Sequence, residues 1–195
     1  MVLQGEGADG DACVTSVAID SRKAEAGGVF VAVPGERVDG HRFIPAAFAS
    51  GAVLAVTQKR PEEAVEAEGE RAARPSGEAL GAAQPEGASR TGDEAPADSA
   101  GSWGCYVLVE DTLQALKDIA EAYRKKLSVK VIGITGSVGK TSTKEFIAAV
   151  LAEKYSVLKT EGNFNNEIGV PLTLLRIRGE HELAVVEMGI SDFGE

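Results

Sequence analysis

The sequence has few cysteines and no long apolar run. Its two cysteines, Cys13 and Cys105, lie far apart, and no stretch reaches the roughly 20 apolar residues that a membrane-spanning helix needs. The amino terminus has neither the basic start nor the apolar segment of a secretory leader. We therefore expect a protein of the reducing cytoplasm, without membrane insertion. Its 195 residues, 44% of them hydrophobic, are enough for one or two folded domains.

Basic residues are scarce relative to acidic ones. Lysine and arginine number 20 against 30 aspartates and glutamates, which gives a net charge of −10. Such a surface repels a phosphate backbone, so we expect no nucleic-acid partner. Residues 61–102 carry ten of the acids and only three bases, and they contain no aromatic residue. Because so little apolar surface cannot offset the entropy of ordering, we predict a disordered insertion at 61–102.

The segments on either side of this insertion alternate between strand and helix patterns. Strands are predicted at 14–19, 29–33, 51–57 and 105–110, with a short helix at 43–50. The insertion is therefore expected to be an expanded surface loop within one domain. We predict a small N-terminal α/β domain over residues 1–110.

The remaining sequence predicts a connecting helix and a second domain. Residues 111–127 place apolar side chains along one helical face. Beyond them, strands are predicted at 130–135, 156–159 and 183–188, and helices at 140–154 and 168–176. Strands that alternate with helices form a parallel sheet. The fold class is therefore α/β, with an incomplete P-loop-type parallel-sheet domain over residues 128–195.

The most specific pattern is a glycine turn between a predicted strand and a helix that opens with Lys140 and Thr141. In such loops backbone N–H groups surround phosphate oxygens, the lysine reaches the terminal phosphates and the hydroxyl binds Mg²⁺. The usual spacing puts a glycine at position 134, where Ile134 stands, so this loop is a variant. An ordinary turn with a helix cap is the alternative. We predict a nucleoside triphosphate site formed by Gly136, Ser137, Val138, Gly139, Lys140, Thr141 and Ser142.

Two further polar features follow predicted strands. Glu187 ends the apolar strand at 183–188, where a carboxylate can complete a Mg²⁺ site with Thr141. A strand-end acid that faces solvent is the alternative. The segment 160–171 is rich in asparagine and follows the strand at 156–159. Spacing alone leaves open whether it binds a polar ligand or forms a turn and helix cap.

Three segments, TGSVGKTSTKE at 135–145, TEGNFNNEIGVPLTLL at 160–175 and VVEMGISDFGE at 185–195, resemble the Mur ligases of peptidoglycan synthesis in this order. The resemblance extends to IDSR at 19–22, GGVFVAVPGERVDGHRF at 27–43 and GAVLAV at 51–56. Within the family, GNFNNE and EMG favour the branch that joins D-alanyl-D-alanine to UDP-N-acetylmuramoyl-tripeptide. The branch that adds the third peptide residue is the nearest alternative.

The resemblance implies an ATP-dependent amide ligase. ATP would phosphorylate the terminal carboxylate of UDP-N-acetylmuramoyl-tripeptide, and the amino group of D-alanyl-D-alanine would attack the acyl phosphate. Lys140 is then catalytic, and Thr141 and Glu187 are the Mg²⁺ ligands. The implied substrate-binding residues are Ser21, Arg22, Asp39, Gly40 and His41 in the first domain, and Asn163, Asn165, Asn166 and Glu167 in the second.

The chain also departs from the family pattern. Relatives continue with a carbamylated lysine and a carboxyl-terminal domain for the amine substrate, and neither is present in this sequence. We therefore expect an amino-terminal part of a ligase, monomeric and unable to ligate alone. A nucleotide-binding or UDP-sugar-binding module without turnover is the alternative from another functional class. A GTP-hydrolysing switch would need a guanine-reading motif, and this sequence shows none.

Overall fold

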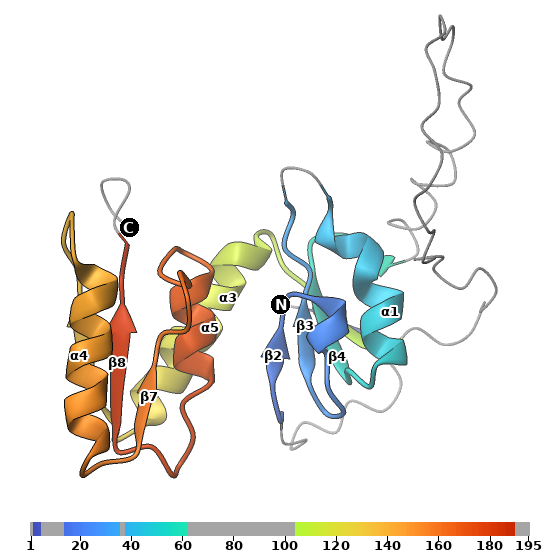
Figure 1. Ribbon diagram of the computed structural model, residues 1–195. Helices are drawn as coiled ribbons and strands as arrows, with labels where there is room; N and C mark the ends of the chain where they lie inside the picture. Colours follow the sequence, from blue (N-terminus) through green and yellow to red (C-terminus); the bar gives the residue numbers. More distant parts are fainter. Residues whose placement is uncertain (1, 5–13, 36–37, 62–103, 190–195) are drawn as a thin grey trace, which may run out of the picture.

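The computed structural model describes residues 2–4, 14–35, 38–61 and 104–189, which form two α/β units with a long helix between them (Figure 1). The predicted disordered insertion lies, apart from Pro61, outside the described residues, as does Cys13. Among the described residues, no helix has the length and apolar character needed to cross a membrane.

The N-terminal unit is built on a five-stranded sheet in the order β1-β5-β4-β3-β2. Its strands are β1 (Val2–Gln4), β2 (Val17–Ala18), β3 (Val29–Val31), β4 (Leu54–Thr57) and β5 (Cys105–Leu108). The strands β2 to β5 are parallel, and β1 pairs antiparallel with β5. The sequence did not predict β1, because three residues are too short to show an alternating pattern.

The helices of this unit cover one face of the sheet. Helix α1 (Ile44–Ala49) buries Ile44 against Phe30, Ala55 and Tyr106. Two short 3-10 helices follow strands, η1 (Ser21–Lys23) after β2 and η2 (Gly40–Phe43) after β3. The predicted strand at 14–19 is shorter in the structure, where β2 comprises Val17–Ala18 alone, and the N–H of Thr15 bonds to the carbonyl of Gly27 before β3 begins.

Strands β4 and β5 lie side by side, although 47 residues lie between Thr57 and Cys105 in the sequence. The register pairs Leu54 with Cys105 and Thr57 with Leu108. The described strands on either side of the acidic stretch are thus neighbours in one sheet.

Helix α3 (Thr112–Lys126) is a packing layer as well as a connection. Asp111 caps it by accepting hydrogen bonds from the N–H groups of Leu113 and Gln114, at 2.8 and 3.0 Å. Leu116 and Ala120 are buried in one cluster with Val31 and Val56 of the N-terminal sheet and Leu175 of the second unit. One hydrophobic cluster thus contains residues of both units.

The second unit has a three-stranded parallel sheet in the order β6-β8-β7. Its strands are β6 (Lys130–Ile134), β7 (Val157–Lys159) and β8 (Leu183–Glu187), and its helices are α4 (Lys140–Ala152) and α5 (Gly169–Leu175). Val185 packs toward Ala148 of α4, whereas Ala184 and Val186 pack toward residues of α5. The alternation along β8 places one helix on each face of the sheet (Figure 1). The predicted α/β class and parallel sheet are confirmed.

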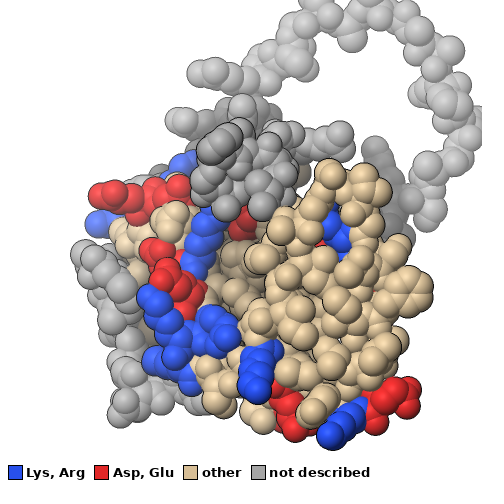
Figure 2. All heavy atoms as spheres, turned by 90° about the vertical axis from the view of Figure 1, so that its left-hand side faces the viewer, with Lys and Arg blue, Asp and Glu red and all other residues tan. Residues whose placement is uncertain are grey.

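The outer side of α4 carries few charges. Figure 2 shows this side of the molecule, where uncharged residues form a broad area and charged side chains gather toward its margins. Phe146 and Val150, one turn apart on α4, are both largely exposed. The inner side of the same helix is the one that carries Lys144 and Ala148.

Candidate functional site

The loop between β6 and α4 has the backbone of a phosphate loop. Gly136 has φ 144° and Gly139 has φ 80°, values that side-chain-bearing residues rarely adopt. Gly139 is also the N-cap of α4, so the exposed N–H groups of the first helical turn face the loop. The Lys140 Nζ donates to the carbonyl of Gly136 at 2.7 Å, which holds its ammonium across the loop. These features give an anion a positive, hydrogen-bond-donating cradle.

Glu187 lies beside this loop because β8 is the neighbour of β6, and the register pairs it with Ile134. Its side chain is 1% exposed, so it is not the solvent-facing acid of the alternative interpretation. The Oε1 accepts hydrogen bonds from Thr141 Oγ1 at 3.1 Å and from Asn165 Nδ2 at 2.9 Å. Three segments that are remote in sequence therefore meet at one carboxylate oxygen.

The second oxygen of this carboxylate supports a cation site. Oε2 of Glu187 is buried and accepts no hydrogen bond in the described structure, although the Lys144 ammonium lies 3.6 Å from it. A hydroxyl and a carboxylate are ligands that Mg²⁺ accepts, with phosphate oxygens and water as the others. No group of three His, Cys, Asp or Glu side chains that could hold a metal occurs among the described residues. The donor set of Thr141 and Glu187 thus fits Mg²⁺.

The residues of the asparagine-rich segment have different surroundings: Asn165 contacts a candidate site residue, and Asn166 caps a helix. Asn165 contacts Glu187, and its carbonyl accepts the N–H of Gly189 at 2.6 Å, which ties the segment to the exit of β8. Asn166 Oδ1 accepts the N–H of Gly169 at 2.8 Å and so caps the start of α5. Glu167 forms an ion pair with Lys117 of α3 at 3.0 Å. Asn163 is exposed, and its carbonyl accepts the N–H of Asn165.

Sequence reasoning missed two residues of this site. Lys144 is 1% exposed and its Nζ lies 3.6 Å from Glu187 Oε2. Thr160 is fully buried, and its Oγ1 accepts the N–H of Glu187 at 2.9 Å. The position of Lys144 carried a signal, because it precedes Ala148 by one turn on the apolar side of α4. Thr160 directly follows the short strand β7, and no sequence pattern indicated that it would be buried.

In the N-terminal unit, Asp39, Gly40 and His41 form a closed network. His41 is 2% exposed; its Nδ1 bonds to Asp39, and its Nε2 accepts the N–H of Gln58 at 3.1 Å. Because that N–H needs an acceptor, the ring proton of neutral His41 is on Nδ1. A Cβ on Gly40 would lie 2.4 Å from the carbonyl of Val33, so only glycine fits there. Both nitrogens of His41 are thus used within the domain, which leaves Asp39 as the accessible polar group.

The Asp39 carboxyl is strongly acidic. Burial raises its pKa, but the hydrogen bonds from the side chain and backbone of His41 and from Lys59 lower it further, to about 2. The Lys59 Nζ lies 3.3 Å from Asp39 Oδ2. Asp39, which caps η2, and Lys59, which follows β4, therefore form an ion pair that joins these two parts of the unit.

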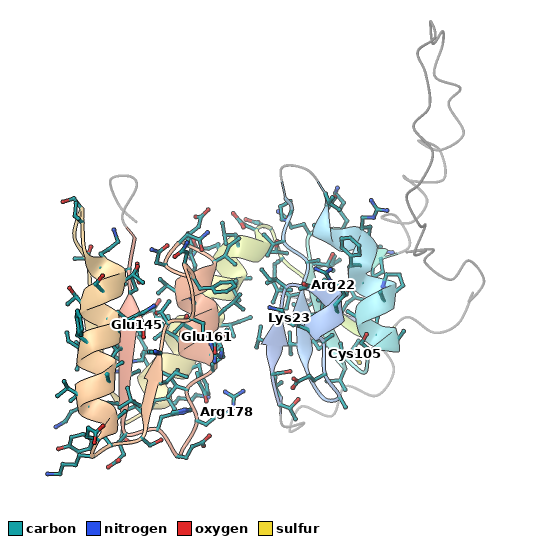
Figure 3. The ribbon with its side chains drawn as sticks, viewed as in Figure 1. Arg22, Lys23, Cys105, Glu145, Glu161 and Arg178 are labelled. Carbon is teal, nitrogen blue, oxygen red and sulfur yellow. The ribbon has the colours of Figure 1, made fainter. Side chains whose placement is uncertain are left out.

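Ser21 and Arg22 lie in η1, at the end of β2. Asp20 caps this turn, accepting the N–H of Arg22 at 3.1 Å and pairing with its guanidinium at 2.9 Å. This arrangement lowers the pKa of Asp20, chiefly through the hydrogen bond from the Arg22 side chain. Ser21 is buried and Arg22 is exposed. The next residue, Lys23, places its Nζ 6.0 Å from the centre of the Phe164 ring, so η1 faces the asparagine-rich segment (Figure 3).

The predicted residues thus form two groups. Residues 136–142, Glu187 and Asn165 meet at the carboxyl edge of the second sheet, whereas Asp39, Gly40 and His41 meet in the first unit. Contacts such as Lys23 over Phe164 and Arg178 Nη2 to the Thr15 carbonyl, at 3.0 Å, join the units.

Comparison with known proteins identifies the family. A model described as the Mur ligase middle domain matches residues 134–195, and one described as the Mur ligase family catalytic domain matches residues 14–88. The UDP-N-acetylmuramoyl-tripeptide–D-alanyl-D-alanine ligase of Synechocystis is 40% identical over 95% of this chain and 33% of its own length. The ligase of the same name from Bacillus subtilis is 38% identical over 93% of this chain and 32% of its own. The chain belongs to the MurF family of Mur ligases.

Solved structures agree with this assignment. MurF from Acinetobacter baumannii matches the MurF-family chain with a TM-score of 0.67 and 32% identity, covering 93% of this chain and 32% of that protein. MurF from Thermotoga maritima, solved in complex with ADP, matches with a TM-score of 0.63 and 30% identity over 93% of this chain and 34% of its own. The chain spans about a third of the length of the relatives it matches.

Proposed function

We propose that this MurF-family chain contributes the nucleotide-binding loop and the UDP-sugar-binding unit of an ATP-dependent amide ligase. The reaction is the addition of D-alanyl-D-alanine to UDP-N-acetylmuramoyl-tripeptide through an acyl phosphate. The observation that carries the proposal is the contact of Thr141, in the glycine loop, with the buried Glu187 at the end of the adjacent strand. A phosphate cradle alone binds anions, whereas this contact adds ligands for the cation that accompanies ATP.

In this proposal the loop residues bind and orient the triphosphate. The backbone N–H groups of residues 136–142 hold phosphate oxygens, and Lys140 leaves the Gly136 carbonyl to reach the transferred phosphoryl group. Thr141 and Glu187 hold Mg²⁺, which when bound offsets the negative charge of the phosphates. Asn165 keeps the Glu187 carboxylate turned toward Thr141. The protein thereby positions the reacting phosphoryl group and neutralises charge, which is its main contribution to phosphoryl transfer.

The first unit is proposed to bind the uridine nucleotide end of the substrate. Ser21 and Arg22 end β2, and Asp39 lies on the turn after β3. In open parallel sheets, ligands bind at the carboxyl ends of strands, which is where these residues lie. His41 and Gly40 act here by holding Asp39, because the structure leaves them no free polar side-chain group for a ligand. Asn163, Asn166 and Glu167 are proposed to line the peptide end of the same substrate.

Two binding experiments and one assay test this function. Calorimetry should detect ADP binding that strengthens with Mg²⁺, and separate binding of UDP-N-acetylmuramoyl-tripeptide. Release of phosphate on addition of D-alanyl-D-alanine and ATP would show turnover. Because we expect this part of a ligase not to ligate alone, binding of both ligands without phosphate release is the expected result, and phosphate release would overturn that expectation. A chain that binds neither ligand would overturn the proposal.

A further inference from the structure

Lys144 is a buried lysine that the proposed function does not use. Its side chain is 1% exposed, and its Nζ lies 3.2 Å from Glu145 Oε1, 3.5 Å from the Gly162 carbonyl and 3.6 Å from Glu187 Oε2. A buried ammonium is stable only when anionic or carbonyl oxygens surround it. Its three partners belong to α4, to the segment after β7 and to the end of β8. One charge therefore contacts α4, the segment after β7 and the end of β8 together.

The geometry of α4 directs two side chains at the same carboxylate. Thr141 and Lys144 are three residues apart, so they lie on one face of the helix. Thr141 donates to Oε1 of Glu187 and the Lys144 ammonium lies beside Oε2. Asn165 adds a second donor on Oε1. The carboxylate is thus held from both sides, which fixes its rotation about the last side-chain bond.

The neighbouring ion pairs differ in their exposure. Glu145 also pairs with Lys159 of β7, but both of these side chains are more than 40% exposed, so solvent screens that pair. Lys144 and Glu187 are each 1% exposed. Removing one partner of such a buried pair leaves an uncompensated charge, which is strongly unfavourable. Lys144 and Glu187 therefore depend on each other, whereas Lys159 is dispensable to both.

We propose that Lys144 is a positioning residue that acts through Glu187. It holds the Glu187 carboxylate with one oxygen toward Thr141, so that the Mg²⁺ ligands are in place before the nucleotide arrives. The proposal rests on the proposed function of the loop as a Mg²⁺-nucleotide site. Groups that orient a metal ligand from behind change metal affinity by about 10- to 100-fold when they are removed.

The first test compares two lysine-to-methionine substitutions. Lys144→Met keeps the apolar stem and removes the charge, and Lys159→Met does the same to the other lysine that contacts Glu145. Binding of fluorescent ADP is titrated with Mg²⁺ for each variant. Lys144→Met should raise the Mg²⁺ concentration for half-maximal binding about tenfold or more, and change ADP affinity in EDTA less than about threefold. Lys159→Met should leave the Mg²⁺ titration unchanged.

An unchanged or lower Mg²⁺ midpoint for Lys144→Met would overturn the proposal, since it would mean that Lys144 does not help Glu187 to bind the metal.

The second test asks whether Lys144 acts through Glu187. In a Glu187→Gln background, Lys144→Met should shift the Mg²⁺ midpoint by less than about twofold, because the carboxylate that it positions is gone. In thermal unfolding without nucleotide, the double variant should melt at a higher temperature than Lys144→Met alone, since it leaves no unpaired buried charge. Should Lys144→Met fail to fold, a double variant that also fails to fold would overturn the coupling, and a folded double variant would support it.

These outcomes separate the two proposals. A wild-type chain that does not bind ADP at any Mg²⁺ concentration overturns the nucleotide site, and the positioning of its metal ligand with it. A wild-type chain that binds ADP with Mg²⁺ while Lys144→Met behaves like Lys159→Met overturns the role of Lys144 alone.

Discussion

Thr141 and Glu187 are 46 residues apart in the sequence, yet the hydroxyl of one donates to the carboxylate of the other at 3.1 Å. The contact exists because β8 inserts between β6 and β7, and its last residue comes level with the end of β6. It joins the first turn of the phosphate-loop helix to the carboxyl edge of the sheet. The predictions that follow test this site and the packing that supports it.

Lys140→Ala should weaken ATP binding by about 10- to 100-fold. A hydrogen bond to a charged group contributes about 1.5–3 kcal/mol, and each 1.4 kcal/mol is a factor of ten in affinity. Calorimetry with ATP and Mg²⁺ measures the change. Lys154→Ala is the matched control, because Lys154 lies just beyond the other end of α4 and contacts the Tyr155 ring. Equal affinities for the wild type and Lys140→Ala would remove Lys140 from the phosphate site.

Glu187→Gln should raise the Mg²⁺ requirement of nucleotide binding by about tenfold or more, a loss of at least about 1.4 kcal/mol. The amide keeps the size of the side chain and one oxygen for Thr141, but it removes the negative charge that Mg²⁺ needs. Binding of ADP in EDTA should change little. A Mg²⁺ titration that overlays the wild-type curve would show that Glu187 is not a metal ligand.

Asp39→Asn should reveal a pH-dependent contribution to stability. The folded pKa of Asp39 is lowered from 3.8 to about 2, so the unfolded chain binds more protons between these values and stability rises with pH there. The wild type should therefore exceed Asp39→Asn in melting temperature by a constant margin above about pH 5, and lose that margin as the pH falls from 3.8 toward 2. Thermal unfolding at a series of pH values measures it. A margin that does not narrow in acid would contradict the prediction.

Leu116→Ala should destabilise both units together. Leu116 is fully buried on α3, among residues of the first sheet and of α5, and such truncations cost about 2–5 kcal/mol. Calorimetry should show one unfolding transition, shifted to lower temperature. Lys126→Ala, at the exposed end of the same helix, is the control. Two separate transitions in the wild type would show that the shared cluster does not couple the units.

Several elements could be predicted because their signals are local. Alternating apolar residues and turn residues identified the four parallel strands β2 to β5 and the whole second unit, with differences mainly at the ends of elements. The glycine loop was readable because only glycine accepts the backbone of Gly136 and Gly139 without strain. Helix α3 was predicted as a connection from its single apolar face, and that face is the part that lies in the shared cluster.

Other features needed information that no short segment contains. Helical periodicity puts Lys144 on the same side of α4 as Ala148, but only the fold shows that its partner there is Glu187. His41 reads as a candidate ligand until the N–H of Gln58, 17 residues away, occupies its Nε2. The asparagines at 163–166 look alike in sequence, and only the position of β8 assigns Asn165 to the carboxylate while Asn166 caps a helix.

The sequence by itself determined the local conformations and the kinds of chemistry present, because backbone preferences and hydrophobic periodicity act over a few residues. It also determined the family, through motifs that occur in a set order. Only the tertiary structure decided which oxygen of Glu187 each neighbour contacts and which polar residues are used internally. The reason is that burial and strand order bring together groups from α4, β8 and the segment after β7, and the energy of a charge depends on those neighbours.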